Sequence, residues 1–174
     1  MGNKFITNLK MRRSIRAYQD KKPSPESIRR IAEAGSYAPN GLGKQSATIV
    51  VVTEKSLRDR LSRMNATILG TTADPFHGAP IVAIVLADRS VPTYIYDGAL
   101  VMGNMLNAAH SEGLGSCWVH RAKEMFESKE GKALLGEWGL REELEGIGCC
   151  VLGYSSDEEL PPPRPRKKDY IIYI

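Results

Sequence analysis

The sequence has little of what marks several classes of protein. Its three cysteines stand in no CxxC or other metal-like spacing, which argues against a disulfide framework and a zinc site. It contains no HExxH or GxSxG motif and no Walker loop. No signal-peptide core opens the chain, and the most apolar runs, 79–87 and 99–105, are too short to cross a membrane. We therefore expect a cytoplasmic protein with no membrane segment and no bound metal.

The composition is that of an ordinary globular protein, with 42% hydrophobic and 25% charged residues. The 174 residues suit a single domain spanning 1–174, because no internal repeat or low-complexity linker divides them. The net charge of +4 fits an anionic small molecule as easily as a nucleic acid. Composition alone does not choose between these partners.

Hydrophobic periodicity and breaker residues predict helices and strands in alternation. Helices are expected at 3–11, 25–37, 54–64, 93–112 and 123–136, strands at 47–53, 79–87, 115–120 and 146–154, and an irregular loop at 65–78. The continuous β-branched run at 47–53 indicates a strand buried on both faces. The helix at 93–112 is apolar or small almost all round, which is typical of the centre of a domain or of a dimer. The pattern predicts a layered sheet-and-helix domain of the α/β or α+β class that dimerises.

Residues 160–174 read as a C-terminal arm. Prolines at 161, 162, 163 and 165 favour an extended, polyproline-like path. The apolar tail at 169–174, DYIIYI, resembles a strand. Because a lone exposed strand invites aggregation, we expect it to pair with another strand, with a second subunit as one source.

The basic run that ends in Arg16 contains a candidate anion site. If the segment is extended, the side chains of Arg12, Ser14 and Arg16 point the same way. Two guanidinium groups and a hydroxyl then converge, which suits a phosphate dianion. A solvated basic helix end is the alternative interpretation, since short basic runs are common.

Three further segments have residues suited to a ligand. In the loop 38–45, Gly41 and Gly43 allow the backbone to approach a flat ligand, and Gln45 offers a donor and an acceptor. In 113–118 the first glycine ends a helix, whereas a planar ring against the backbone would explain Gly115. The basic cluster at 164–168 could bind an anion. The alternatives are an ordinary loop, a helix cap before a buried strand, and a solubilising or nucleic-acid-binding tail.

Four segments in this order resemble the nitroreductase family of flavoproteins. They are MRRSIRAY at 11–18, APNG at 38–41, the stretch from DGA at 97–99 to GLGSCW at 113–118, and LGY at 152–154 with the basic arm behind it. The resemblance implies an α+β fold with a central sheet flanked by helices. It also implies an intertwined homodimer with two FMN sites at the subunit interface.

The resemblance assigns the binding of FMN to named positions. Arg12, Ser14 and Arg16, with Arg13 beside them, would hold the phosphate and ribityl chain. The residues expected from the remaining segments are Pro39, Asn40 and Gly41, which would line the flavin from the partner subunit, then Gln45, Gly115 and Ser116 near the ring, and Arg164 and Arg166 returning to the phosphate. No side chain is expected to be catalytic, because FMN carries the redox chemistry.

The implied activity is two-electron transfer from NADH or NADPH through FMN to an electrophile such as a nitroaromatic or a quinone. Lys44 is a candidate to stabilise the reduced flavin. The loop at 43–47 departs from the family's N-x-Q-P-W and keeps only the glutamine, and the chain lacks the inserted helices of larger members, which predicts an open cleft. The altered loop leaves open an FMN-binding protein that does not use NAD(P)H. A nucleic-acid-binding module is disfavoured, because 20 acidic residues are spread through the chain.

Overall fold

The computed structural model describes residues 3–156, 160 and 162–174, and it contains one antiparallel sheet. The strands follow the spatial order β1-β2-β4-β3. Their bounds are β1 (Ala47–Val52), β2 (Ile81–Asp88), β3 (Gly115–Val119) and β4 (Leu144–Gly153). The two central strands, β2 and β4, are buried along almost their whole length, whereas β1 and β3 form the edges.

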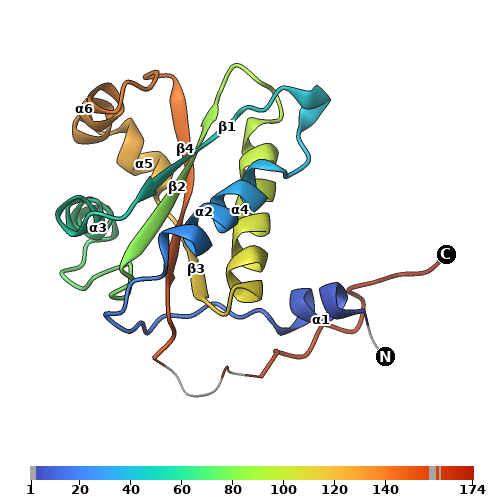
Figure 1. Ribbon diagram of the computed structural model, residues 1–174. Helices are drawn as coiled ribbons and strands as arrows, with labels where there is room; N and C mark the ends of the chain where they lie inside the picture. The colour runs from blue at the N-terminus through green and yellow to red at the C-terminus, as the bar shows by residue number, and fades with distance from the viewer. Residues whose placement is uncertain (1–2, 157–159, 161) are drawn as a thin grey trace.

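Helices cover both faces of this sheet, as Figure 1 shows. They are α1 (Lys4–Met11), α2 (Pro25–Ser36), α3 (Lys55–Leu69), α4 (Tyr94–Ser111), α5 (Ala122–Glu127) and α6 (Lys129–Glu137), with a short 3-10 turn η1 (Gly41–Gly43). The helices α2 and α4 pack on one face, and α3, α5 and α6 on the other (Figure 1). The α+β architecture expected from the sequence is confirmed.

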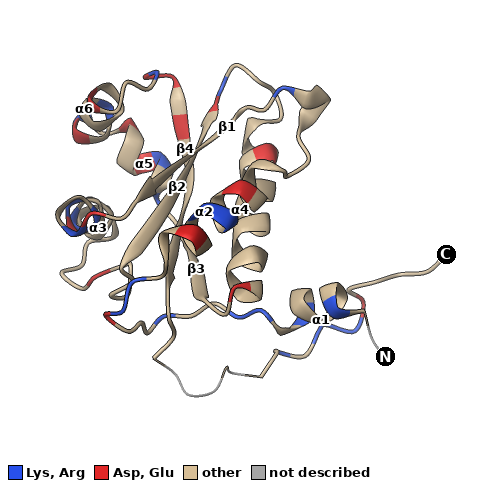
Figure 2. Ribbon diagram, viewed as in Figure 1, with Lys and Arg blue, Asp and Glu red and all other residues tan. Residues whose placement is uncertain are grey.

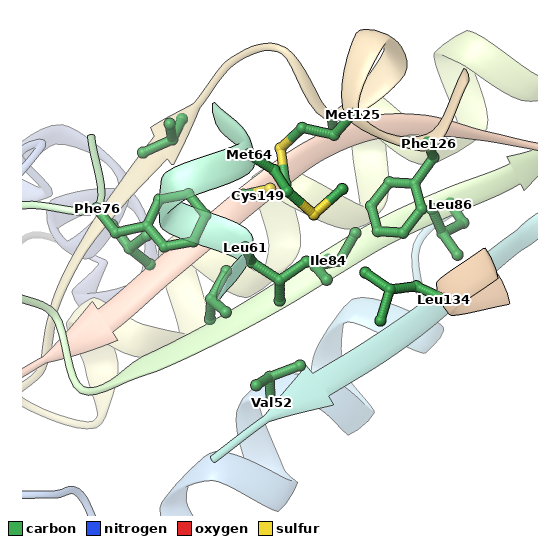
Figure 3. Close-up of a cluster of buried hydrophobic side chains, with 14 of the residues drawn as sticks. Val52, Leu61, Met64, Phe76, Ile84, Leu86, Met125, Phe126, Leu134 and Cys149 are labelled. Atoms are coloured by element: carbon green, nitrogen blue, oxygen red, sulfur yellow. The ribbon is translucent and has the colours of Figure 1, made fainter. Parts of the chain in front are cut away.

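The sheet separates two apolar clusters. Figure 3 shows part of the larger one, in which Leu61 of α3 and Phe126 of α5 meet Ile84 of β2. The second cluster joins Ile31 of α2 and Met105 of α4 to the opposite face. Burying each such side chain contributes about 1.5–3 kcal/mol, so the two clusters together hold the three layers in place.

Local sequence signals set several helix ends. The Ser24 hydroxyl accepts a hydrogen bond from the Ser27 N–H, and Pro25 stands at the first position of α2, as predicted. The helix α3 ends at Gly70, whose φ of 73° places it in the left-handed region.

The expected ends and burial of some elements were wrong. Residues 65–69 belong to α3, because Asn65 and Ala66 are buried and the left-handed stop comes only at Gly70. The predicted helix at 123–136 is two helices, since Ser128 breaks the chain and caps α6 through the Gly131 N–H. The strand β1 is not buried on both faces: it is an edge strand, and most of its residues are partly exposed.

The arm leaves the sheet after Ser155, which forms an isolated bridge with Tyr18. Residues 162–174 are exposed and form no strand, so the tail at 169–174 has no partner strand among the described residues (Figure 1). Residues 157–159 and 161 lie outside the description, and the start of the predicted proline path lies among them. None of the described helices is long and apolar enough to cross a membrane.

Candidate functional site

The basic segment, residues 12–16, lies against the start of β3. It follows α1 directly, and Ser14 forms a parallel bridge with Ser116. The Ile15 N–H donates to the Ser116 carbonyl at 3.0 Å, and the Ile15 side chain is 2% exposed. Because Ile15 points inward, its neighbours Ser14 and Arg16 are exposed on the outside.

Three side chains of this segment keep their donors free. Within the described part of the chain, no hydrogen bond or ion pair engages the side chains of Arg12, Ser14 and Arg16. The Nη1 of Arg12 is buried as well and still has no acceptor there. A buried guanidinium nitrogen without an acceptor is costly. The arrangement is therefore suited to an anion that supplies the missing acceptors.

The electrostatic surroundings of the segment are positive. Figure 2 shows Lys and Arg at the end of α1 and along the stretch that follows. Near the C-terminal end of α4, burial and the charges of Arg12 and Arg13 lower the pKa of His110. A neutral imidazole in this place adds no charge of its own, so the guanidinium groups dominate the local field.

Arg13 differs from the residues beside it. Its Nη1 donates to the carbonyls of Lys10 at 2.8 Å and Arg12 at 2.7 Å. These are the unsatisfied carbonyls at the end of α1, which basic side chains commonly cap. The guanidinium of Arg13 thus stabilises the turn from which the segment starts.

Packing within the chain explains why position 115 is a glycine. A Cβ at Gly115 would lie 3.0 Å from three atoms of the Ile15 side chain. Ser116 is 1% exposed, and its hydroxyl lies 3.5 Å from the Leu106 carbonyl of α4. Gly115 and Ser116 thus form the part of β3 against which the basic segment packs. Contact of either residue with a ring stays a prediction.

The loop after α2 is tightly folded. The Asn40 Oδ1 accepts the Gln45 N–H at 2.9 Å, and Leu42, Gly43 and Gln45 all have positive φ. A Cβ at Gly41 would lie 2.2 Å from Thr93 Oγ1, so the backbone of this residue presses on the start of α4. Pro39, Lys44 and Gln45 are exposed, and no described atom lies within 4 Å of a Cβ placed on Gly43. The exposed side of the loop is thus open to another molecule.

This loop and the basic segment lie at opposite ends of α4 (Figure 1). The loop contacts Asp97 in the first turn, whereas the basic segment acts on His110 in the last turn. Asp97 and His110 are thirteen positions apart, and at a rise of about 1.5 Å per residue this corresponds to about 20 Å. One chain therefore does not bring the two predicted halves of the site together.

Arg164 and Arg166 of the arm do not complete the anion site within the described part of this chain. Arg166 donates from Nε and Nη2 to the Arg164 carbonyl, at 3.2 and 2.7 Å, and both residues are exposed. In the described ranges, neither residue forms a hydrogen bond or an ion pair with the segment 12–16. Their return to a phosphate stays a prediction.

Asp97 and Glu112 are isolated carboxylates in the sequence, and such residues are expected to have structural roles. Glu112 fits that expectation, because it binds Arg30 through both oxygens at 2.9 and 2.6 Å. Asp97 fits it as well, because its hydrogen bonds hold the loop 40–46 against the start of α4. Its position at the start of the DGA helix was visible in the sequence, but its three partners were not, since they depend on how the loop folds back.

Comparison with known proteins identifies the family. The model of the Nitroreductase family matches residues 9–71. A candidate NADH dehydrogenase/NAD(P)H nitroreductase of Archaeoglobus fulgidus is 31% identical over 155 residues, which cover 85% of this chain and 83% of that protein. A Bacillus subtilis FMN reductase [NAD(P)H] is 28% identical over 93% of this chain and 70% of its own length. The chain belongs to the nitroreductase family.

Solved structures agree with this fold. A nitroreductase of Bacteroides fragilis with bound FMN superposes with a TM-score of 0.91 at 26% identity, covering 99% of this chain and all of the other. A second FMN-bound nitroreductase, from Desulfitobacterium hafniense, gives a TM-score of 0.88 at 23% identity with complete coverage of both chains. This second likeness concerns the fold alone.

Proposed function

We propose that this protein is an FMN-dependent oxidoreductase that takes electrons from NADH or NADPH and reduces an electrophile such as a nitroaromatic or a quinone. The observation that carries the proposal is the buried, unpartnered Nη1 of Arg12, with the free donors of Ser14 and Arg16 beside it. The FMN-bound nitroreductase of Bacteroides fragilis and the NAD(P)H named for the curated relatives support it. Three buried free cysteines fit a reducing, cytoplasmic setting.

The residues present fit the phosphate end of FMN. A phosphate dianion offers acceptor oxygens to guanidinium and hydroxyl donors, and such charge-assisted bonds are the stronger kind. The Ser14–Ser116 bridge and the packing of Ile15 against Gly115 fix the backbone from which these donors project. The site is therefore preorganised, which lowers the entropic cost of binding.

The side chains of the proposed site bind and orient FMN, and bound FMN supplies the two-electron chemistry. Lys44, on the exposed side of its loop, is the proposed cation that would stabilise negative charge on the ring. The proposed role of Pro39, Asn40 and Gly41 is to form a wall for the ring. Gln45 offers its exposed amide to a ring edge.

The proposal includes a homodimer in which each FMN lies between two chains. The separation of about 20 Å along α4 supports this, because the loop of a second copy could meet the basic segment of the first. The outer face of α4 carries large exposed apolar side chains, namely Ile95, Tyr96 and Leu100. Exposed apolar surface of this kind marks protein interfaces.

The C-terminal tail has a matching surface for the same dimer. The open edge of β1 borders a groove of about 780 Å³ between α2 and β1, whose apolar lining includes Ile28, Ile49 and Val51. The tail 169–174 is apolar and exposed, with Tyr173 91% exposed. We place the tail of one chain along β1 of the other, where it would gain backbone hydrogen bonds and cover apolar side chains.

An absorbance spectrum of the purified protein tests the function. The protein should be yellow, release FMN on denaturation, and lose its flavin absorbance when NADH or NADPH is added without oxygen. Colourless protein that cannot be loaded with FMN would refute the proposal. A bound flavin that neither nicotinamide bleaches would favour the alternative, an FMN-binding protein serving in storage, breakdown or a dedicated redox partnership.

Subunit mixing tests the shared site. A chain carrying Arg12→Ala and Arg16→Ala is refolded together with a chain carrying Gly41→Val, each of which should bind FMN poorly alone. A shared site predicts that the mixture regains FMN, because each heterodimer contains one site with both halves intact. No recovery in heterodimers that are shown to form would place the whole site in one chain.

A further inference from the structure

Asp97 is a buried carboxylate that accepts hydrogen bonds from the loop between α2 and β1 and from Thr93, the N-cap residue of α4. It is 2% exposed. Its Oδ1 accepts the Gly41 N–H at 3.0 Å, and its Oδ2 accepts the Ser46 hydroxyl at 2.7 Å and the Thr93 hydroxyl at 3.1 Å. Two of these donors stand at the two ends of the segment 41–46. The carboxylate therefore ties the two ends of this segment together.

No cation among the described residues compensates this buried charge. Among the residues described, Asp97 takes part in no ion pair. Burial would raise the pKa of Asp97, but the bonds from Ser46, Gly41 and Thr93 outweigh burial and lower it. The first turn of α4 also favours a negative side chain through the helix dipole. The carboxylate is thus held ionised by the loop, and the loop is held by the carboxylate.

The loop needs such a restraint. Leu42 and Gln45 are not glycines but have φ of 52° and 48°, a region that is unfavourable for most side chains. Leu42 is also 95% exposed, so packing of its own side chain does not stabilise this conformation. The bonds from Gly41 and Ser46 to Asp97 hold the two ends of this segment, and the Gln45 N–H bond to Asn40 Oδ1 holds its interior.

We propose that Asp97 is a positioning residue for the flavin site, which fixes the wall that residues 40–45 present to FMN. The inference rests on the proposed function, since it needs FMN to lie against this loop. In the proposed site, Asp97 touches neither FMN nor substrate. It acts through the backbone of Gly41 and the hydroxyl of Ser46.

Asp97→Asn tests the proposal, because the amide keeps the size of the side chain but removes the charge and turns one acceptor into a donor. Glu145→Gln is the matched control: Glu145 is also buried, at 6% exposure, and its partners Tyr94 and Lys123 lie outside the loop. Ser46→Ala removes one donor and serves as a milder second variant. The measurements on FMN-loaded protein are amide hydrogen exchange of residues 39–47 and of β4, the Kd for FMN, and KM and kcat with NADH or NADPH.

In Asp97→Asn we expect the amide exchange rate of residues 39–47 to rise by about tenfold to a hundredfold, because one hydrogen bond to a charged group is lost. The amides of β4 should exchange at the wild-type rate. The Kd for FMN or the KM should rise by about tenfold, with a smaller change of the same kind in Ser46→Ala and none in Glu145→Gln. Faster loop exchange with unchanged Kd and KM would overturn the positioning role alone. Wild-type protein that binds no FMN would overturn the proposed function and this role with it. If Asp97→Asn does not fold, an unchanged loop, Kd and KM in Ser46→Ala would overturn the proposal.

Discussion

Replacing Arg12 by methionine should affect stability and FMN binding in opposite directions. Methionine is unbranched and apolar and can fill much of the same space without the charge. In the ligand-free protein, Arg12 buries an Nη1 that has no acceptor among the described residues, so its removal relieves a penalty of about 1–3 kcal/mol. Arg12→Met should therefore leave the free energy of unfolding unchanged or raise it by about 1 kcal/mol, after the loss of packing is counted.

FMN binding should become weaker in the same variant. A hydrogen bond to a charged group contributes about 1.5–3 kcal/mol, which corresponds to about a tenfold to hundredfold rise in Kd. Saturating FMN stabilises a protein according to the ratio of its concentration to Kd. At a fixed, moderate FMN concentration the wild type should thus unfold at a higher urea concentration than Arg12→Met. Without FMN, the wild type should unfold at the same or a lower urea concentration than Arg12→Met.

Urea unfolding with and without FMN, together with a fluorescence titration of FMN, measures both effects. Arg60→Met is the control, because Arg60 forms ion pairs with Glu130 and Glu137 on the far face of the sheet. The control should keep the wild-type Kd. A wild-type Kd in Arg12→Met, or a loss of more than about 2 kcal/mol of stability without FMN, would show that Arg12 has a structural role instead.

Gly115, the C-terminal tail, Asp74 and Cys149 give four further tests. Gly115→Ala should destabilise the protein by about 1–3 kcal/mol and weaken FMN binding, because its Cβ would lie 3.0 Å from Ile15; equal stability by urea unfolding would contradict the seating of the basic segment. Deletion of 169–174 should lower the dimer fraction in sedimentation and the FMN content together, and a deletion that leaves both unchanged would refute the tail's proposed place. The pKa of Asp74 is lowered to about 2, as hydrogen bonds outweigh burial, so its stabilising contribution is present above the unfolded-state pKa near 4 and is lost as the pH falls towards 2; Asp74→Asn should flatten this part of the stability profile. Burial raises the pKa of Cys149 to about 12, so thiol reagents should label it only on unfolding, and rapid labelling of native protein would contradict its burial.

Elements with local signals could be predicted from the sequence. The start of α2 follows from Ser24 and Pro25, whose effects act within one turn of helix. The apolar runs of β2 and β4 fixed the middle of the sheet, although β4 begins at Leu144, two residues before the predicted start. The start of β4 could not be predicted because Glu145 is charged, and a charged residue is unexpected in a buried strand. In the structure, Glu145 is compensated by its hydrogen bond with Tyr94 and its ion pair with Lys123.

Features that depend on distant contacts could not be predicted. The β-branched run of β1 looks the same in an edge strand as in a central strand, and only the sheet order distinguishes them. Gly115 had an apparent need for a ligand because the packing of Ile15 across β3 is not a local property. The three partners of Asp97 likewise come together only when the loop folds onto α4.

A crystal structure of the FMN-loaded protein would show where the flavin phosphate binds. We expect the phosphate within hydrogen-bonding distance of Arg12 Nη1 and the Ser14 hydroxyl, with the side chain of Arg16 turned towards it. We also expect residues 39–41 from a second chain to lie beside the ring of the same FMN. A phosphate bound elsewhere, with Arg12 Nη1 still lacking an acceptor, would contradict the assignment of this basic segment as the flavin phosphate site.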